Sequence, residues 1–380
     1  MKRLSFTTLV SVLLAFPIVD QAQGCVLKFK KTIGVGTEAG WMHFVAFSHD
    51  GTMVASDGPA NAHDRNEALT LWSFPDGHFI RSIPFPPWVI SDDWKYYASN
   101  HAVIDVESGK PRIALTRNDN EWARPAFSHD GRYVAFTMSK QIRILRTEDG
   151  TLVKEFGKRA VFSLAFHPDD KTLATGHWDT VTLWNALTGE RIALLRGFKR
   201  YVCGIGFSHD GKLLAAGTDD GQVQIWDLPK RRRLRTIDLT GGQVSDPAFS
   251  PDDTVVAAGV YGTGTVSVID VRTGTILDQA RVSDLGCGSV AFSPDGKYLI
   301  VPSTGGLVTW PYDRGGTIRV FEVHTAKARP AAKRKTPMRV SLRGICRGHR
   351  RVRVSLVNLC QSHRWVWISD LRIWRASLGV

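Results

Sequence analysis

Short runs of alternating apolar and polar residues, separated by turn residues, recur along most of the chain. Tyr133–Phe136 and Leu213–Ala216 follow this pattern, and so do the later runs Ile142–Ile144 and Val181–Trp184. Alternation with a period of two residues is typical of a β-strand that buries one face. The pattern therefore predicts many short strands and an all-β protein.

An apolar anchor opens each unit of the pattern, and a small polar pair, an acid and a turn residue follow it. Clear copies begin at Phe47, Phe127, Phe166, Phe207, Phe249 and Phe292, and a weaker copy begins at Ile90. Successive anchors are 43, 37, 39, 41, 42 and 43 residues apart. The Asp-Gly and Pro-Asp-Gly sequences favour hairpin turns, because glycine takes a positive φ without a Cβ clash. Such regular spacing indicates a repeat architecture.

Each unit contains further strands after the hairpin. Val223–Trp226 is typical of a third strand, and Arg191–Leu195 follows a Thr-Gly turn as a fourth. Four short strands in about 40 residues make one propeller blade. A blade buries its faces only against its neighbours, so a ring is the stable arrangement. We predict a seven-bladed β-propeller of four-stranded antiparallel blades.

These repeats resemble the WD-repeat β-propeller family, and more closely its YVTN-type, secreted bacterial members. Trp226-Asp227 is a WD dipeptide, whereas Trp72-Ser73 and Trp184-Asn185 stand at the same place in other repeats. The Gly-His that precedes each blade in the family is missing here. The family's His-Ser-Trp-Asp hydrogen-bond tetrad is therefore expected to be mostly absent. The resemblance places Asp179 and Asp219 at the turn position of the tetrad, with a structural role.

The two ends of the repeat region complement each other. Val26–Ile33 reads like a fourth strand that has no blade of its own, and Pro330 interrupts the continuation of the seventh repeat. Pairing of the N-terminal strand beside residues 316–323 removes a free sheet edge and completes the ring. The resemblance implies the same closure.

The N-terminus has the three parts of a secretory signal. Lys2 and Arg3 precede a mostly apolar run over residues 9–19, and Ala22 and Gly24 stand before Cys25. We predict a signal peptide over residues 1–24, a propeller over 25–324 and a periplasmic or secreted location. Cys25 is either a free cysteine or a lipid acceptor, and a membrane partner is expected only in the second case.

The positive charge of the chain is concentrated in its last residues. The 380 residues include 43% hydrophobic and 22% charged residues, with a net charge of +13. Residues 325–380 contain 14 Lys and Arg against one acid, Asp370, so the preceding residues sum to zero. We therefore predict no nucleic-acid partner and interpret 325–380 as a basic tail that is disordered or out of frame. The alternative is a tail that binds anionic surfaces.

The tail also contains two Cys-x2-His pairs, Cys346/His349 and Cys360/His363. Their spacing does not match a standard zinc finger, and we assign no metal site. No P-loop, G-x-S-x-G or His-Glu-x-x-His motif is present, and the turn acids such as Asp50 and Asp210 recur because hairpins favour them. We assign no catalytic residue and no cofactor.

Loop lengths single out blades one and seven. From the anchor to the third strand there are 22 residues in blade one and 26 in blade seven, against 15 to 17 in blades three to six. In a ring these two blades are neighbours, so their long loops are expected side by side on one rim. The predicted binding residues are His63, Asp64 and Arg65 in blade one, Trp310, Tyr312, Asp313 and Arg314 in blade seven, and Trp41, Trp122, Trp178 and Tyr201 near the same face.

We predict a monomeric, non-enzymatic scaffold outside the cytoplasm that binds a protein or peptide through these rim loops, because aromatic and charged residues on a rigid scaffold are typical of recognition sites. The alternative is a secreted propeller enzyme, similar to lactonases or to amine-dehydrogenase subunits. That alternative requires polar groups that converge on the channel, from His43, His63, His177 or Asp64.

Overall fold

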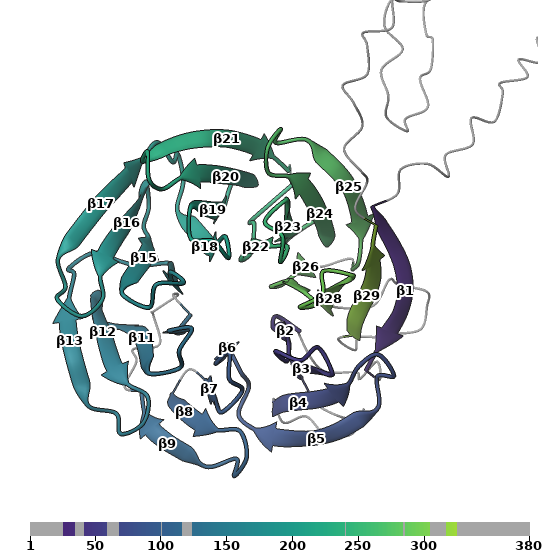
Figure 1. Ribbon diagram of the computed structural model, residues 1–380, viewed down its shortest axis with the longest axis horizontal. Coiled ribbons are helices and arrows are strands. Elements are labelled where there is room, and N and C mark those ends of the chain that lie inside the picture. The colour runs from purple at the N-terminus through teal and green to yellow at the C-terminus, as the bar shows by residue number, and fades with distance from the viewer. Residues whose placement is uncertain are drawn as a thin grey trace, which may run out of the picture. The chain divides into compact units, whose positions relative to one another are not determined.

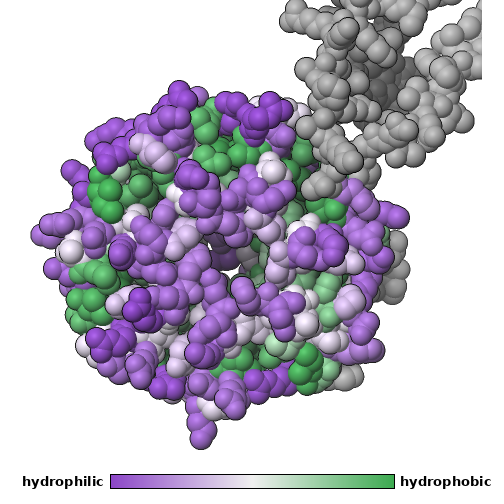
Figure 2. Space-filling model, viewed as in Figure 1, coloured by the Kyte–Doolittle hydropathy of each residue, from purple (hydrophilic) through white to green (hydrophobic). Residues whose placement is uncertain are grey.

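The computed structural model describes residues 26–34, 42–58, 68–99, 101–115, 124–239, 241–283, 286–304 and 317–324. Their strands form seven antiparallel sheets arranged around a central opening (Figures 1 and 2). Each sheet is one blade, and consecutive blades follow one another around the ring. Within the described ranges there is no helix, and so none that could cross a membrane. The prediction of an all-β, seven-bladed propeller is confirmed.

In blades 1 to 6 the strands are ordered from the channel outward in the order of the sequence (Figure 1). Blades 1 to 3 comprise β2 (Val45–Phe47), β3 (Met53–Asp57), β4 (Ala68–Ser73) and β5 (Phe79–Pro84); β6 (Val89–Ile90), β7 (Tyr96–Ala98), β8 (Ala102–Asp105) and β9 (Pro111–Ala114); and β10 (Ala126–Phe127), β11 (Tyr133–Met138), β12 (Gln141–Arg146) and β13 (Leu152–Phe156). Blades 4 and 5 comprise β14 (Ser163–Phe166), β15 (Thr172–Gly176), β16 (Thr180–Asn185) and β17 (Arg191–Arg196); and β18 (Val202–Phe207), β19 (Leu213–Thr218), β20 (Gln222–Asp227) and β21 (Arg232–Asp238).

Blade 6 comprises β22 (Ala248–Phe249), β23 (Val255–Val260), β24 (Thr265–Asp270) and β25 (Ile276–Arg281). Blade 7 begins with two short pieces, β26 (Gly286–Cys287) and β27 (Ala291–Phe292), which both pair with β28 (Tyr298–Thr304), and continues with β29 (Thr317–Val323). Its outermost strand is β1 (Leu27–Ile33), which runs antiparallel to β29 with Leu27 opposite Val323 and Ile33 opposite Ile318 (Figure 1). The seventh blade thus takes its outer strand from the start of the described chain.

Each blade is buried on both faces because it packs against a blade on either side. Val54 and Ala55 in β3 are fully buried, as are Leu299 and Ile300 in β28. Ile300 belongs to a core that blade 7 shares with Val54 of blade 1. The last blade therefore packs against the first as the others pack against their neighbours, and this shared core holds the ring together.

The repeated sequence phrase is a hydrogen-bonded turn between the first and second strands. In blade 5 the hydroxyl of Ser208 donates to Asp210 Oδ1 (2.8 Å) and accepts from Leu213 N (2.8 Å). Asp210 also accepts from Lys212 N (2.9 Å). The hydrogen bonds from Lys212, and after them the one from Ser208, lower the pKa of Asp210 to about 2. The recurring acids thus stabilise turns, because a carboxylate satisfies backbone N–H groups that the strands leave unpaired.

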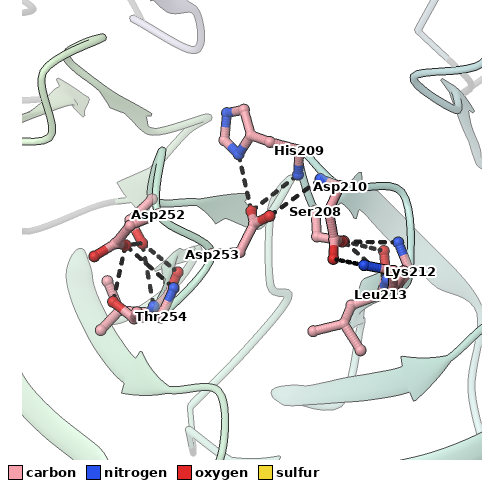
Figure 3. A network of polar contacts seen from close by, with 10 residues as sticks. Ser208, His209, Asp210, Lys212, Leu213, Asp252, Asp253 and Thr254 are labelled. Atoms are coloured by element: carbon pink, nitrogen blue, oxygen red, sulfur yellow. Dashed lines mark hydrogen bonds and ion pairs between the residues drawn. The ribbon is translucent and has the colours of Figure 1, made fainter.

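Two repeats replace the turn glycine with a second aspartate, and this residue links neighbouring blades. Asp253 has φ 55°, the left-handed conformation that Gly211 adopts in blade 5 (φ 70°). Its carboxylate accepts hydrogen bonds from the backbone N–H groups of His209 (2.9 Å) and Asp210 (3.1 Å) in the preceding blade (Figure 3). Asp170 accepts from His129 N (2.6 Å) in the same way. The positive φ strains the backbone of the aspartate, and the interblade hydrogen bonds of its carboxylate offset this cost.

The tryptophans near the WD position differ in their partners. Trp72 Nε1 donates to Ser56 Oγ (3.0 Å), and Trp184 Nε1 donates to Thr175 Oγ1 (2.9 Å). Trp226 Nε1 is buried and finds no hydrogen-bond partner among the described atoms. Asp179, at the tetrad's turn position, pairs instead with Arg159 (3.3 Å) near the surface. Among the described residues of these blades, the hydrogen-bond tetrad of the WD repeat is therefore only partly formed.

Candidate functional site

One face of the ring gathers the loops that lead into the first strand of each blade and those that join its second and third strands. We call it the upper face, and the face with the first-to-second and third-to-fourth turns the lower face. This separation follows from the common strand order of the sheets. Blades 7 and 1 are neighbours, and the strands that flank their long loops end on the upper face.

Most of the binding residues predicted from the sequence lie outside the described residues: His63, Asp64, Arg65, Trp310, Tyr312, Asp313, Arg314, Trp41 and Trp122. Their role as a rim site stays a prediction. The described ones are Trp178 and Tyr201, and the structure brings them together. The signal-peptide residues, Cys25, and the tail with its Cys and His pairs also lie outside the described residues.

Three aromatic rings form a ladder on the upper face between blades 4 and 5. Phe162 and Tyr201 have ring centroids 5.0 Å apart, and Tyr201 and Trp178 have centroids 5.5 Å apart. The ladder is anchored from below because Val202 N donates to His177 O (2.9 Å) and Asp219 N donates to Tyr201 O (3.2 Å). Trp178 is 53% exposed. A large aromatic side chain is therefore held in a fixed position with half of its surface in solvent.

Charged residues from opposite sides of the ring meet at the upper mouth of the channel. Arg124 precedes β10 of blade 3, and its guanidinium pairs with Asp246 of blade 6 at 3.2 Å and lies 5.5 Å from the ring centroid of Trp88 in blade 2. Desolvation inside the ring raises the pKa of Asp246, and the Arg124 charge opposes this rise. The pair stays partly accessible, with 28% of the Arg124 side chain and 36% of the Asp246 side chain exposed. These groups can therefore meet a ligand that enters from the upper face.

A second polar group lies beside this pair. Asp57, at the end of β3, accepts hydrogen bonds from the N–H groups of His43 (2.9 Å) and Phe44 (2.8 Å). Burial raises the pKa of Asp57 to about 7. Burial, with a contribution from Arg124, lowers the pKa of His43 to about 4, and the Tyr261 hydroxyl forms a hydrogen bond with His43 Nδ1. At neutral pH the His43 ring is therefore uncharged.

Only part of the polar set required by an enzyme is found at the channel. His43 lies at its upper mouth, but His177 is buried between blades, with hydrogen bonds at both ring nitrogens. The remaining two candidates, His63 and Asp64, lie outside the described residues. In the described part of the chain, no three His, Cys, Asp or Glu side chains are grouped as metal ligands would be.

Sequence reasoning missed Arg124, Asp246, Asp57, Tyr261 and Trp88 as site residues. A signal for the first two was present, because each stands three residues before its anchor, Phe127 or Phe249. The same position holds glycine in blade 5 and serine in blades 4 and 7. In blades 1 and 2 it holds Phe44 and Pro87, so Arg124 and Asp246 are the charged residues at a position that is uncharged in the other five repeats. Alignment of the repeats would have shown this difference, which is an indication of function.

The fold and the channel mouth define the class of protein, a seven-bladed β-propeller built from WD-type repeats. The family model for the WD domain, G-beta repeat, matches residues 150–185 and 189–227. Each matched stretch begins near the outer strand of one blade and ends with the third strand of the next, from β13 to β16 and from β17 to β20. The chain therefore contains WD40 repeats.

Curated relatives support the same class. The small ribosomal subunit protein RACK1y of rice is 30% identical over 165 residues, which is 41% of this chain and 45% of the relative. Pre-mRNA-processing factor 19 of rice is 31% identical over 39% of this chain and 29% of the relative. The COMPASS component SWD3 of yeast is 27% identical over 55% of this chain and 70% of the relative. The chain thus spans less than half the length of the first two relatives.

The predicted periplasmic or secreted location is wrong. These relatives come from rice and yeast, and their names associate them with the ribosome, pre-mRNA processing and COMPASS rather than with secretion. The prediction rested on the local composition of residues 1–24 alone, a basic start followed by a short apolar run.

Proposed function

We propose that this propeller is a scaffold that binds a protein or peptide partner on its upper face. The observation that carries the proposal is Trp178, which is 53% exposed and packed against Tyr201. Tryptophan and tyrosine held rigidly at a surface are enriched among the residues that dominate binding energy. They lose little conformational freedom when a partner covers them, so more of the contact energy contributes to affinity.

The channel mouth gives the same face a means of orienting a partner. Arg124 and Asp246 present opposite charges 3.2 Å apart, so a polar group of the partner can exchange with either member of the pair. Such pairs set orientation and association rate more than affinity. We therefore assign the binding energy chiefly to the aromatic ladder and the register of the partner to the charged pair.

The names of the relatives are consistent with a scaffold. One is a small ribosomal subunit protein and another is a component of COMPASS, so both names denote members of larger assemblies. We also retain in the proposal the blade-one and blade-seven loops predicted from the sequence, with His63, Asp64, Arg65, Trp310 and Tyr312 as contacts.

Affinity purification of wild-type protein and two variants tests the proposal. Trp178→Ala should weaken capture of a specific partner by about 30-fold, since loss of such a residue typically costs about 2 kcal/mol or more and 1.4 kcal/mol is tenfold. Phe79→Ala is the matched control, because Phe79 is 51% exposed but lies at the start of β5, near the lower face. Equal capture by both variants, with unchanged melting temperatures, would refute the site. Trp310→Ala with Tyr312→Ala tests the loop contribution separately.

A further inference from the structure

A pocket lies between blades 3 and 4 along β17, and its upper end is near the ladder. Its volume is about 170 Å³, and its wall contains Lys158, Arg159, Arg191, Arg196, Trp184 and His177. His177 directly precedes Trp178 of the ladder in the sequence, and Lys158 and Arg159 stand between the last strand of blade 3 and the first of blade 4. Arg196 ends β17 near the upper face, whereas Arg191 begins this strand near the lower face. Four basic side chains thus line one small cavity whose upper end reaches the proposed docking surface.

The inner wall of the pocket is fixed by a chain of hydrogen bonds. Trp184 Nε1 donates to Thr175 Oγ1 (2.9 Å), and this hydroxyl donates to His177 Nε2 (2.9 Å). His177 Nδ1 in turn donates to the carbonyl oxygen of Ala160 (2.8 Å), and Phe156 packs against Trp184 with ring centroids 5.3 Å apart. Burial lowers the pKa of His177, so its ring is neutral at pH 7 and serves as a wall of the pocket.

The charges around the pocket are not balanced by the described residues. Arg159 pairs with Asp179 at 3.3 Å. For Lys158, Arg191 and Arg196, the described part of the chain offers no ion-pair partner. Three positive charges therefore face one cavity. Their mutual repulsion is relieved if an anion enters, and a phosphate monoester offers nearly two negative charges and three acceptor oxygens to these donors.

The size of the pocket limits what the anion belongs to. Pockets that enclose drug-sized ligands usually measure roughly 300 to 1,000 Å³. A pocket of about 170 Å³ is smaller, and suits a side chain rather than a whole nucleotide. The ladder beside it offers aromatic surface for the flanking residues of a peptide. We propose that the pocket binds the phosphate group of a phosphorylated serine or threonine on the partner, an inference that rests on the proposed function of the upper face.

Binding to oriented peptide libraries tests this proposal. One library has phosphoserine or phosphothreonine fixed at its centre among degenerate positions, and the second has serine or threonine there. Wild-type protein should bind the phosphorylated library about tenfold more tightly, or better, because arginine–phosphate hydrogen bonds are charge-assisted and often bidentate. Arg191→Gln with Arg196→Gln should abolish this preference. Arg231→Gln with Arg232→Gln removes the same charge at the third-to-fourth turn of blade 5, where neither residue lines the pocket, and should leave the preference unchanged.

The outcomes separate the pocket from the ladder and from other anions. Trp178→Ala should weaken binding of both libraries equally and so preserve the phosphate preference. If wild type shows no phosphate preference but Trp178→Ala still weakens binding, the pocket proposal fails and the ladder stands. If Trp178→Ala leaves the binding of both libraries unchanged, the ladder proposal fails. The proposal is overturned if wild type shows no phosphate preference, or if the control pair abolishes it equally. It is also overturned if inositol hexakisphosphate or a poly-U oligonucleotide binds through Arg191 and Arg196 while the phosphopeptides do not.

Discussion

The substitution Asp57→Asn should change how the stability of the propeller depends on pH. Asp57 is 7% exposed, and its carboxyl group accepts hydrogen bonds from the backbone of His43 and Phe44. Burial raises its pKa from 3.8 to about 7. Asparagine has nearly the same shape and keeps one acceptor oxygen, but it cannot ionise. The variant therefore removes the titration of this group and retains most of its packing.

The sign and size of the effect follow from proton linkage. Between about pH 4 and pH 7 the folded protein retains the Asp57 proton that the unfolded chain has released, so this group lowers the free energy of unfolding as pH rises through that window. A difference of about 3 pH units at 1.36 kcal/mol each corresponds to about 4 kcal/mol. The free energy of unfolding of the variant, relative to that of wild type, should therefore rise by about 4 kcal/mol from pH 3.5 to pH 8. At every pH it is also lower by about 1 kcal/mol, because the substitution weakens a hydrogen bond.

His43 has the opposite effect. Its pKa is lowered to about 4, so below pH 6.5 the unfolded chain binds a proton that the folded protein does not, and stability rises with pH through this window. In wild type the two slopes oppose each other. In the variant, of these two groups only His43 titrates, so the free energy of unfolding should rise from pH 4 to pH 6.5.

Urea denaturation at half-unit steps from pH 3.5 to pH 8 measures both slopes. Equal m-values for the two proteins at each pH are needed for the comparison, since a changed m-value indicates a different unfolded or native state. If the free energies of unfolding of wild type and variant run parallel across the whole range, Asp57 does not hold its proton in the folded ring and the reasoning about the channel mouth is wrong.

Substitutions at three further positions test the packing of the ring by urea denaturation. Ile300→Ala should lower the free energy of unfolding by about 2 to 5 kcal/mol, since Ile300 is fully buried in the core between blades 7 and 1, and a smaller loss would contradict close packing there. Asp253→Gly keeps the left-handed turn, whereas Asp253→Ala adds about 1 to 2 kcal/mol of strain, so the alanine variant should be the less stable of the two. Trp184→Phe removes the donor to Thr175 and should cost about 1 kcal/mol, and no loss would show that the hydrogen-bond chain is not needed for stability.

The sequence was sufficient to predict the fold because its turns are encoded locally. The Ser-x-Asp-Gly phrase specifies a hairpin within a few residues, as Ser208 and Asp210 show, and its even spacing determines how many blades follow. The copies with Asp170 or Asp253 in place of glycine broke the pattern locally, and their carboxylates proved to bond to the preceding blade. These interblade hydrogen bonds depend on the neighbouring repeat, so the sequence of a single repeat does not predict them.

The candidate site was harder to predict because it depends on contacts across the ring. Arg124 and Asp246 are 122 residues apart in the sequence and meet because blades 3 and 6 face each other over the channel. Trp178 and Tyr201 were both expected near one face, but their packing against each other depends on the close approach of blades 4 and 5. The prediction of the location is wrong for a different reason, because it depends on the composition of residues 1–24 alone, which lie outside the described residues.

The central claim is that a protein partner docks on the upper face over the aromatic ladder. Site-specific photo-crosslinking tests it directly, with p-benzoylphenylalanine placed at Trp178 in one protein and at Phe79 in the other, and both irradiated in cells of the source organism. Adducts with one defined protein at position 178, and none at position 79, are the predicted result. Adducts at position 79 alone, or none at either position in a protein that still folds, would contradict the claim.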